Sequence, residues 1–344
     1  MLVSEFEIRE IPLHGRFRIQ LEAFLNRFDL EFEPDLSYAV GLYNRDELAA
    51  CGGCSRNVIK CVAVQPELQG GGFLAKIVSH LYLHLKRNGI DDIFVYTKPE
   101  HRKKFENLGF YCITGTNKIV LLESDLNGIS RYIDTIKKVL PDNQPEYGAI
   151  VMNANPFTLG HQYLAEKASE MCSHLIIFTV KEDCSVFPSE IRLELIREGV
   201  QNLKNITVVE GGDYIISAAS FPAYFLKEKT GVAKIQAELD LTLFCSRIAG
   251  PLKITQRFMG YEPFDPMTDE YNALMKTILP SFNISPVFIP RLEIDGMAVS
   301  ASRVRKLLKD GNLELVRRLV PGSTLRFLQS ERAIPVIQKI KQEY

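Results

Sequence analysis

The sequence has almost no excess charge of either sign, because 41 lysines and arginines stand against 42 aspartates and glutamates in 344 residues. A broad electrostatic footprint for nucleic acid or for an anionic membrane is therefore not expected. No apolar run reaches the length of a membrane span. The N-terminus alternates acidic and apolar residues and lacks the basic start and apolar stretch of a signal peptide. We expect a cytoplasmic protein with neither a nucleic-acid nor a membrane partner.

Cysteine spacing gives no sign of a disulfide framework or a metal site. The seven cysteines are odd in number, which fits a reducing compartment. Cys51 and Cys54 could suggest zinc or redox chemistry, but the sequence has no second pair of this spacing. Both lie in an expected strand, where residues three apart face opposite sides of a sheet. Two thiols on opposite faces cannot chelate one metal, so we expect no structural metal and assign these thiols to packing.

The length and pattern of the chain indicate two domains. A chain of 344 residues is long for one compact domain, and a hydrophobic content of 46% is enough for real cores. Residues 127–140 carry apolar side chains at helical spacing, and Pro141 and Pro145 interrupt the chain before a new strand at Gly148. We predict an N-terminal domain over residues 1–140, including this connecting helix, and a C-terminal domain over residues 141–344.

The first domain contains a glycine run between a strand and a helix. The strand is expected over residues 58–64, the run is Gln69–Gly72, and the helix covers residues 73–87. Glycines let the backbone approach a ligand closely, and free N–H groups at a helix start form an anion site that would suit a diphosphate. A flexible surface turn is an equally good explanation of this segment taken alone.

The order of these elements resembles the GNAT N-acetyltransferase superfamily. The strand Cys61–Val64 followed by Gln69–Gly72 looks like its coenzyme A loop, and Thr97–Phe110 looks like a later stretch of that family, whereas Leu74 departs from it. The resemblance implies an α+β domain that binds a coenzyme A-like group. It does not establish acetyl transfer, because the sequence shows no convincing general base. The residues implied in binding are Val64, Gln69, Gly70, Gly71 and Gly72.

The second domain alternates strands and helices, which predicts a Rossmann-like parallel sheet wound by right-handed crossovers. The expected strands are residues 148–154, 174–180 and 206–209, and the expected helices are residues 162–171 and 189–201. Ligands bind such sheets beyond the carboxyl ends of the strands, and the turn over residues 155–161 lies at such an end.

The chemistry of that turn suits a phosphate. Thr158 can hydrogen-bond a phosphate oxygen, Gly160 removes the side chain where phosphate must come close, and His161 opens the following helix. The imidazole and the helix dipole then point at the same anion. Such a histidine can stabilise charge that develops on an α-phosphate as pyrophosphate leaves. The alternative is a capping threonine with a structural histidine.

A second anion motif lies near the C-terminus. Ser302 is the expected N-cap of a helix, and Ser300 and Arg305 add a hydroxyl and a guanidinium at the same helix start. This arrangement suits the terminal phosphates of ATP. An ordinary capped surface helix would explain this motif alone, but the two motifs together are rarely a coincidence.

Thr158-Leu-Gly-His161 and Val299-Ser-Ala-Ser-Arg-Val-Arg305 resemble the two signatures of the nucleotidyltransferase superfamily, from which Ala301 departs by losing a hydroxyl. The resemblance implies ATP with Mg²⁺, and His161, Arg305 and Lys181 as catalytic residues. Lys181 and Arg192 match positions that often steady substrate or phosphates, although either could be a solvated charge. The implied nucleotide-binding residues are Asn155, Pro156, Phe157, Thr158, Gly160, His161, Ser300, Ala301, Ser302 and Arg305.

The fusion of the two domains resembles the citrate lyase ligase family, including the stretches 213–225, 237–244 and 258–272. The resemblance implies an acid–thiol ligase that converts acetate and ATP to acetyl-adenylate and pyrophosphate. The acetyl group would then pass to the prosthetic-group thiol of the acyl carrier subunit of citrate lyase. Gly260 and Glu262 form a candidate substrate or ribose loop. The alternatives are an adenylyltransferase for a cofactor precursor, an acetyl-coenzyme A-dependent N-acetyltransferase, and a non-catalytic binding protein.

Overall fold

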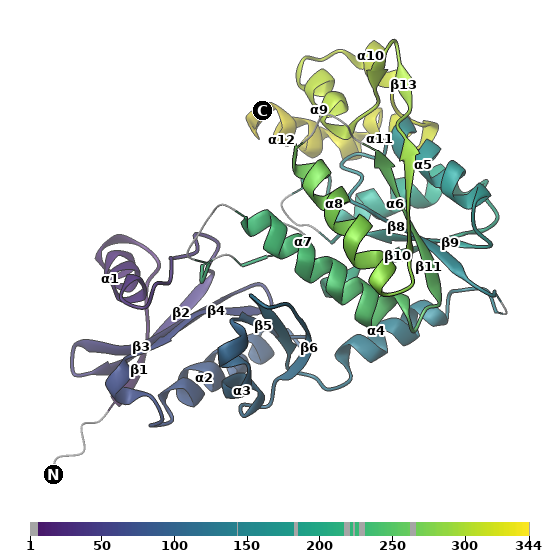
Figure 1. Cartoon of the computed structure of the whole chain (residues 1–344). Helices are drawn as coiled ribbons and strands as arrows, with labels where there is room; N and C mark the ends of the chain where they lie inside the picture. The colour runs from purple at the N-terminus through teal and green to yellow at the C-terminus, as the bar shows by residue number, and fades with distance from the viewer. Residues whose placement is uncertain are drawn as a thin grey trace. The chain divides into compact units, whose positions relative to one another are not determined.

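The chain folds into two compact units, drawn in Figure 1. The first comprises residues 1–130 and 222–235, and the second comprises residues 131–221 and 236–344. The expected connecting helix, α4 (Gly128–Lys137), therefore groups mainly with the second unit, and the division falls near residue 130 rather than after residue 140. The sequence pattern gave no indication that residues 222–235 return to the first unit.

The computed structural model describes residues 6–142, 144–181, 185–216, 221–222, 224–226, 231–261 and 266–343, and it leaves out the side chains of residues 266–270 and 343. In this part of the chain, no helix has the length and apolarity needed to cross a membrane.

The first unit is built on one mixed sheet with the strand order β1-β2-β3-β4-β5-β7-β6. Neighbouring strands run antiparallel except β4 and β5, which pair in parallel through Val58 and Ile59. Helix α2 covers one face with a stripe of buried aliphatic residues, and its range is the one predicted. The strands are β1 (Phe6–Glu10), β2 (Tyr38–Asn44), β3 (Glu47–Ser55), β4 (Val58–Val64), β5 (Phe94–Thr97), β6 (Tyr111–Gly115) and β7 (Val120–Glu123), and the helices are α1 (Gly15–Asn26), α2 (Phe73–Arg87) and α3 (Arg102–Glu106).

The thiols of Cys51 and Cys54 lie on opposite faces of β3, as the alternation of a strand predicts. Cys51 Sγ contacts the carbonyl oxygen of Cys61 at 3.6 Å, whereas Cys54 packs in the core cluster that includes α2. Burial raises the pKa of the Cys54 thiol to about 11. Such a thiol is protonated and a poor nucleophile at neutral pH.

The second unit is built on a fully parallel sheet with the strand order β10-β9-β8-β11-β12. The chain moves outward from β8 through β9 to β10 and then returns to the other side of β8 with β11. This reversal of direction is a topological switch point, and the carboxyl end of β8 is where such sheets bind ligands. The strands are β8 (Tyr147–Met152), β9 (Leu175–Thr179), β10 (Ile206–Glu210), β11 (Ile254–Tyr261) and β12 (Ser285–Pro290).

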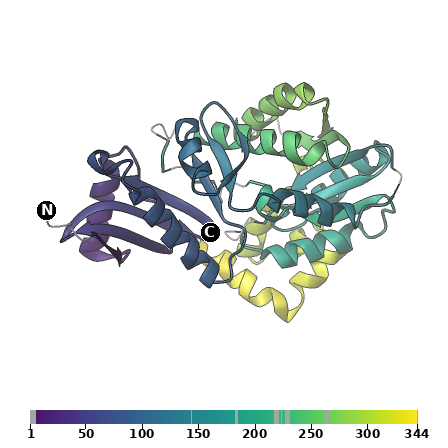
Figure 2. The same ribbon diagram turned by 90° about the horizontal axis from the view of Figure 1, so that it is seen from below.

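Helices cover both faces of this sheet. On one face, Ile150 and Met152 of β8 share a hydrophobic cluster with α5, α6 and the C-terminal helices, which Figure 2 shows in teal and yellow. On the other face, Val151 lies with residues of α7 and α8 around a small cavity. The helices of the first face are α5 (Leu159–Glu170), α6 (Ser189–Val200), α9 (Ala301–Lys309), α10 (Leu313–Arg317), α11 (Gly322–Leu328) and α12 (Ile334–Glu343), and those of the second are α7 (Val232–Leu243) and α8 (Pro266–Ser281). The predicted α/β class is confirmed.

Candidate active site

The turn from β8 into α5 holds His161 in a defined orientation. Thr158 is the N-cap of α5, and its backbone N–H donates to His161 Nδ1 at 3.0 Å. Thr158 Oγ1 also lies 2.9 Å from Nδ1, and it accepts from the His161 backbone N–H at 3.4 Å. Because Nδ1 accepts a hydrogen bond, we assign the ring proton to Nε2, which is then a hydrogen-bond donor. Thr158 is fully buried, so its hydroxyl positions His161 here instead of facing solvent as a phosphate ligand would.

The imidazole of His161 is neutral at physiological pH. Burial, and then the nearby positive charge of Arg291, lower the pKa of His161 to about 4. The ring also lies against Phe157, with centroids 5.8 Å apart and planes 18° apart. His161 therefore offers an N–H donor without adding a positive charge.

We expect His161 to titrate near pH 4 in the folded protein, far below the ordinary histidine value of about 6.5. Since the folded pKa is the lower one, the stability that the neutral ring contributes is complete above pH ~6.5 and is lost as the pH falls towards 4. NMR titration of the imidazole resonances, with His161 assigned by comparison with His161→Gln, measures this midpoint. A midpoint near the ordinary value would contradict a ring that is neutral at physiological pH.

The ends of β8 and β9 are braced by Arg192. Its side chain is fully buried, with Nε donating to the Phe187 carbonyl at 2.9 Å and Nη1 donating to the carbonyls of Asn153 and Val180 at 2.8 Å each. A guanidinium committed to backbone carbonyls in the interior does not reach a phosphate at the surface. Arg192 is thus a structural residue. The sequence left two interpretations open, a phosphate ligand and a solvated charge, and neither describes it.

The residues that open the turn act mainly through their backbone. The Asn155–Pro156 peptide bond is cis, and the carbonyl of Asn155 accepts a hydrogen bond from Arg305 Nη1. The carbonyl of Phe157 accepts one from Thr324 Oγ1 at 2.8 Å. Pro156 and Phe157 have buried side chains, so only their backbone is positioned to contact a nucleotide.

The N-cap of α9 is Ser300, not Ser302 as the sequence suggested. Ser300 has an extended backbone, with φ −131° and ψ 152°, and its Oγ accepts from the Arg303 N–H at 3.2 Å. Ala301 therefore begins the helix, and Ser302 lies within its first turn. Ser302 is exposed, and its Oγ lies 3.1 Å from Ser300 Oγ. Both hydroxyls remain at one helix start, but Ser300 is the capping residue and Ser302 is the additional hydroxyl.

Gly160 joins the two motifs. A Cβ at this position would lie 2.7 Å from the carbonyl oxygen of Val299, which is backbone and cannot rotate away. The two helix starts therefore pack against each other through a glycine, and the Arg305–Asn155 hydrogen bond is a second link. The sequence suggested that Gly160 makes room for phosphate, whereas in the structure it makes room for the second motif.

We expect Gly160→Ala to destabilise the protein by about 1–3 kcal/mol, the usual cost of overpacking a close contact. It should also slow any reaction that needs both motifs, because the helix starts must move apart. Gly250→Ala is the matched control, since a Cβ there meets nothing within 4 Å and the backbone has an ordinary φ. Urea unfolding of both variants measures the difference, and equal stabilities would show that the contact is not close.

Arg291 lies at the candidate site, and the sequence pattern did not identify it. It directly follows β12, at the edge of the sheet where the 155–161 turn begins. It is close enough to His161 to lower the histidine pKa, and its Cγ and Nε would lie 3.8 Å from a Cβ at Gly260. Its position one residue beyond a parallel strand was the only available signal. Glu262, predicted in the same loop as Gly260, lies outside the described residues.

Lys181 lies at the same edge, two residues after the end of β9. Its side chain is half exposed, and its Nζ is 3.6 Å from Asp213 Oδ1. An exposed pair of this kind contributes little to stability, so the ammonium can exchange this partner for a ligand.

The first unit contains a cavity of about 730 Å³ beside the glycine run. Its lining includes Val64, Gln69, Gly70 and Gly72 but not Gly71. Gly70 and Gly72 have φ values of +86° and +78°, in the left-handed region that favours glycine. Basic side chains gather at this cavity, namely Lys98, His101 and Lys104.

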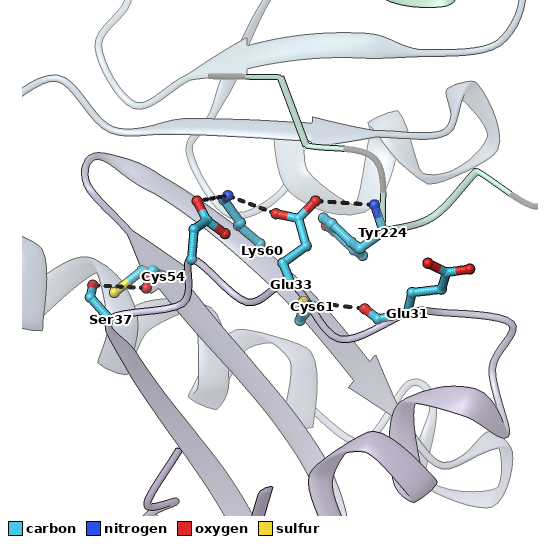
Figure 3. A network of polar contacts seen from close by, with 8 residues as sticks. Glu31, Glu33, Ser37, Cys54, Lys60, Cys61 and Tyr224 are labelled. Atoms are coloured by element: carbon cyan, nitrogen blue, oxygen red, sulfur yellow. Dashed lines mark hydrogen bonds and ion pairs between the residues drawn. The ribbon is translucent and has the colours of Figure 1, made fainter. Parts of the chain in front are cut away.

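A segment from later in the sequence completes the cavity wall with Tyr224 and Phe225. The backbone N–H of Tyr224 donates to Glu33 Oε1 at 3.2 Å, and Lys60 Nζ lies 2.7 Å from Glu33 Oε2 (Figure 3). Lys60 Nζ also lies 2.7 Å from Asp35 Oδ2. Because Lys60 is buried, with 4% of its surface exposed, this is a paired internal charge and not a surface ion pair. It fixes the segment around Tyr224 to the first unit.

Comparison with known proteins places the chain in a family. A family model described as the citrate lyase ligase C-terminal domain matches residues 147–328. A citrate (pro-3S)-lyase ligase of Klebsiella pneumoniae is 39% identical over 318 residues, which cover 90% of this chain and 92% of that protein. One from Haemophilus influenzae is 40% identical over 319 residues, covering 90% and 94%. Among solved structures, Thermotoga maritima TmcAL bound with alpha-thio ATP covers 55% of this chain and 56% of that chain, with 15% identity and a TM-score of 0.36. Because the sequence relatives match along nearly the full length of both proteins, the chain belongs to the citrate (pro-3S)-lyase ligase family.

Proposed function

We propose that this protein activates acetate with ATP as acetyl-adenylate, releasing pyrophosphate, and then acetylates the prosthetic-group thiol of the acyl carrier subunit of citrate lyase. The observation that supports this most directly is the convergence of two anion-binding helix starts. The Gly160–Val299 contact and the Arg305–Asn155 hydrogen bond bring them together beyond the carboxyl end of β8.

The residues at this edge are suited to a departing pyrophosphate. His161 Nε2–H and the start of α5 supply neutral donors, while Arg291 and Arg305 supply positive charge. Ser300, Ser302 and the backbone N–H of Ala301 would contact the terminal phosphates at the start of α9. Lys181 would neutralise the acid or the α-phosphate. These groups stabilise charge where it develops in the transition state.

We further propose that Mg²⁺ enters bound to ATP. Among the described residues, no group of three or more His, Cys, Asp or Glu side chains is arranged to hold a metal ion. Mg²⁺ is commonly bound by substrate phosphates and water with few protein ligands. Its contribution would be to neutralise the β- and γ-phosphates, while the guanidinium and imidazole groups contact the remaining oxygens.

The cavity of the first unit would receive the acceptor arm. Gly70 and Gly72 leave the backbone open for a diphosphate, and Lys98 and Lys104 add positive charge at the same cavity. Burial lowers the pKa of His101, so its ring adds a neutral polar group there. A volume of about 730 Å³ suits a pantetheine–nucleotide group. The buried cysteines suit a reducing cytosol, where this reaction would occur.

Acetate-dependent exchange of labelled pyrophosphate into ATP tests the first step, and acylation of the carrier thiol tests the second. Exchange with acetate, followed by carrier acylation, is the expected result. Exchange that requires a phosphorylated cofactor precursor would instead identify an adenylyltransferase. Acetyl transfer from acetyl-coenzyme A without ATP would identify an acetyltransferase, and nucleotide binding without pyrophosphate release would identify a binding protein.

A further inference from the structure

A second cavity lies inside the second unit, on the face of the sheet that α7 and α8 cover. Its volume is about 210 Å³. Val151 of β8, Val180 after β9 and Met275 of α8 give it apolar walls, and Arg257 of β11 supplies a positive charge. It is smaller than the 300–1,000 Å³ typical of pockets for drug-sized ligands, so it suits a molecule of only a few heavy atoms.

Arg257 is buried, with 3% of its surface exposed, and its hydrogen-bonding capacity is only partly used. Nη2 donates to Tyr271 Oη at 2.8 Å and lies 3.8 Å from Asp240 Oδ2. Nη1 is buried and has no hydrogen-bond partner among the described residues. A buried charged donor left unpaired is costly, and a carboxylate is the acceptor that best matches a guanidinium.

Asp240 does not satisfy the remaining donors of Arg257, because its carboxylate already accepts hydrogen bonds from other groups. Its carboxylate accepts from Tyr271 Oη at 2.9 Å and from the Ile216 N–H at 3.2 Å. Burial raises the pKa of Asp240. A second carboxylate entering the cavity could therefore be accommodated by a proton taken up from solvent and shared with Asp240, which keeps the buried group of charges close to neutral.

The cavity lies beside the edge of the sheet where the candidate active site is built. Val151 is the last residue but one of β8, and the 155–161 turn begins just beyond that strand. Val180 directly precedes Lys181, and its carbonyl is one of those held by Arg192. A small acid in the cavity would thus sit next to the segments that carry His161 and Lys181.

We propose that this cavity is the subsite for the acid that is activated, with the Arg257 guanidinium binding one carboxylate oxygen and Val151, Val180 and Met275 surrounding a short alkyl group. The other carboxylate oxygen is then the nucleophile towards the α-phosphorus. This inference rests on the proposed function and adds the acid-binding residues and the reason for preferring a short acid.

The test measures KM for acetate and for ATP separately, in acetate-dependent pyrophosphate exchange by the full chain. Because Arg257→Met alone would leave Asp240 buried and unpaired, it is combined with Asp240→Asn, and Asp240→Asn alone is the matched control. The double variant should raise KM for acetate by tenfold or more, the effect of losing one hydrogen bond to a charged group. Asp240→Asn replaces the carboxylate by an uncharged group, as protonation of Asp240 would, so the single variant should not raise KM for acetate. KM for ATP should stay unchanged in both variants.

Met275→Ala provides an independent readout that does not touch the buried charges. It enlarges the cavity, so the ratio of kcat/KM for butyrate to that for acetate should rise about tenfold or more. An unchanged acetate KM in the folded double variant, a parallel rise in both KM values, or an unchanged acid preference in Met275→Ala would each overturn the assignment. A wild-type protein without acetate-dependent exchange would instead overturn the proposed function itself.

Discussion

Replacing His161 by alanine should slow acetate-dependent pyrophosphate exchange by a hundredfold or more while the protein stays folded. The loss of one preorganised donor to a developing charge costs about 3–4 kcal/mol in the transition state. The structure makes the assignment specific to Nε2, because Nδ1 already accepts a hydrogen bond from the Thr158 N–H. The same substitution removes part of the capping box of α5, which should lower stability by only about 1 kcal/mol.

His174→Ala is the matched control for this prediction. His174 is another histidine of the second unit and is buried, but it lies just before β9, at the opposite end of the strand from Lys181, and its Nε2 is 2.9 Å from Thr207 Oγ1. We expect it to retain the exchange rate. If a folded His161→Ala protein kept near-normal exchange, His161 would be a capping residue without a role in phosphate chemistry.

Replacing Gly70 and Gly72 by valine should separate the two half-reactions. Both residues have positive φ and line the cavity of the first unit, so valine both strains the loop and fills the space proposed for a diphosphate. Pyrophosphate exchange should remain intact, because its residues all belong to the second unit. The apparent KM for the carrier should rise by roughly tenfold or more, since positioning of the thiol is what the loop would contribute.

Gly89→Val separates strain from ligand binding in this experiment. Gly89 also has a positive φ, +77°, with open space around it, but it follows the other end of α2 and does not line the cavity. It should leave both half-reactions unchanged. Equal loss of exchange and acylation in the Gly70 and Gly72 variants would mean that the loop serves folding or ATP. Normal acylation would mean that the cavity does not receive the carrier arm.

The architecture was largely predictable because it follows from local periodicity. The helix over residues 73–87, the strands around Gly52 and the alternation after residue 147 all appear as repeating apolar patterns. The family was recognisable because the residues of its motifs are adjacent in the sequence, and the phosphate role of the two motifs stays a prediction. The family resemblance is confirmed by relatives that match along almost the full length.

The roles of individual arginines were not predictable, because they depend on contacts between distant segments. Arg192 lies in a helix and Arg257 in a strand. Nothing in the neighbouring sequence indicates that the donors of Arg192 are paired with carbonyls while Arg257 Nη1 has no hydrogen-bond partner among the described residues. Arg291 belongs to no recognisable motif. It lowers the pKa of His161, which lies 130 positions earlier in the sequence. Likewise, the choice of Ser300 over Ser302 as N-cap moves the helix start by two residues, which is within the usual uncertainty of a helix end.

The return of residues 222–235 to the first unit has a consequence for how the protein can be divided. No single cut in the chain separates the two units, because the backbone passes from one to the other at residues 130, 221 and 235. A fragment that ends at residue 130 would lose Tyr224 and Phe225 from the cavity wall and would leave the acceptor Glu33 Oε1 without the Tyr224 N–H. Each unit is therefore built from two separate stretches of sequence. A single crossover between two relatives could not exchange one whole unit and leave the other intact.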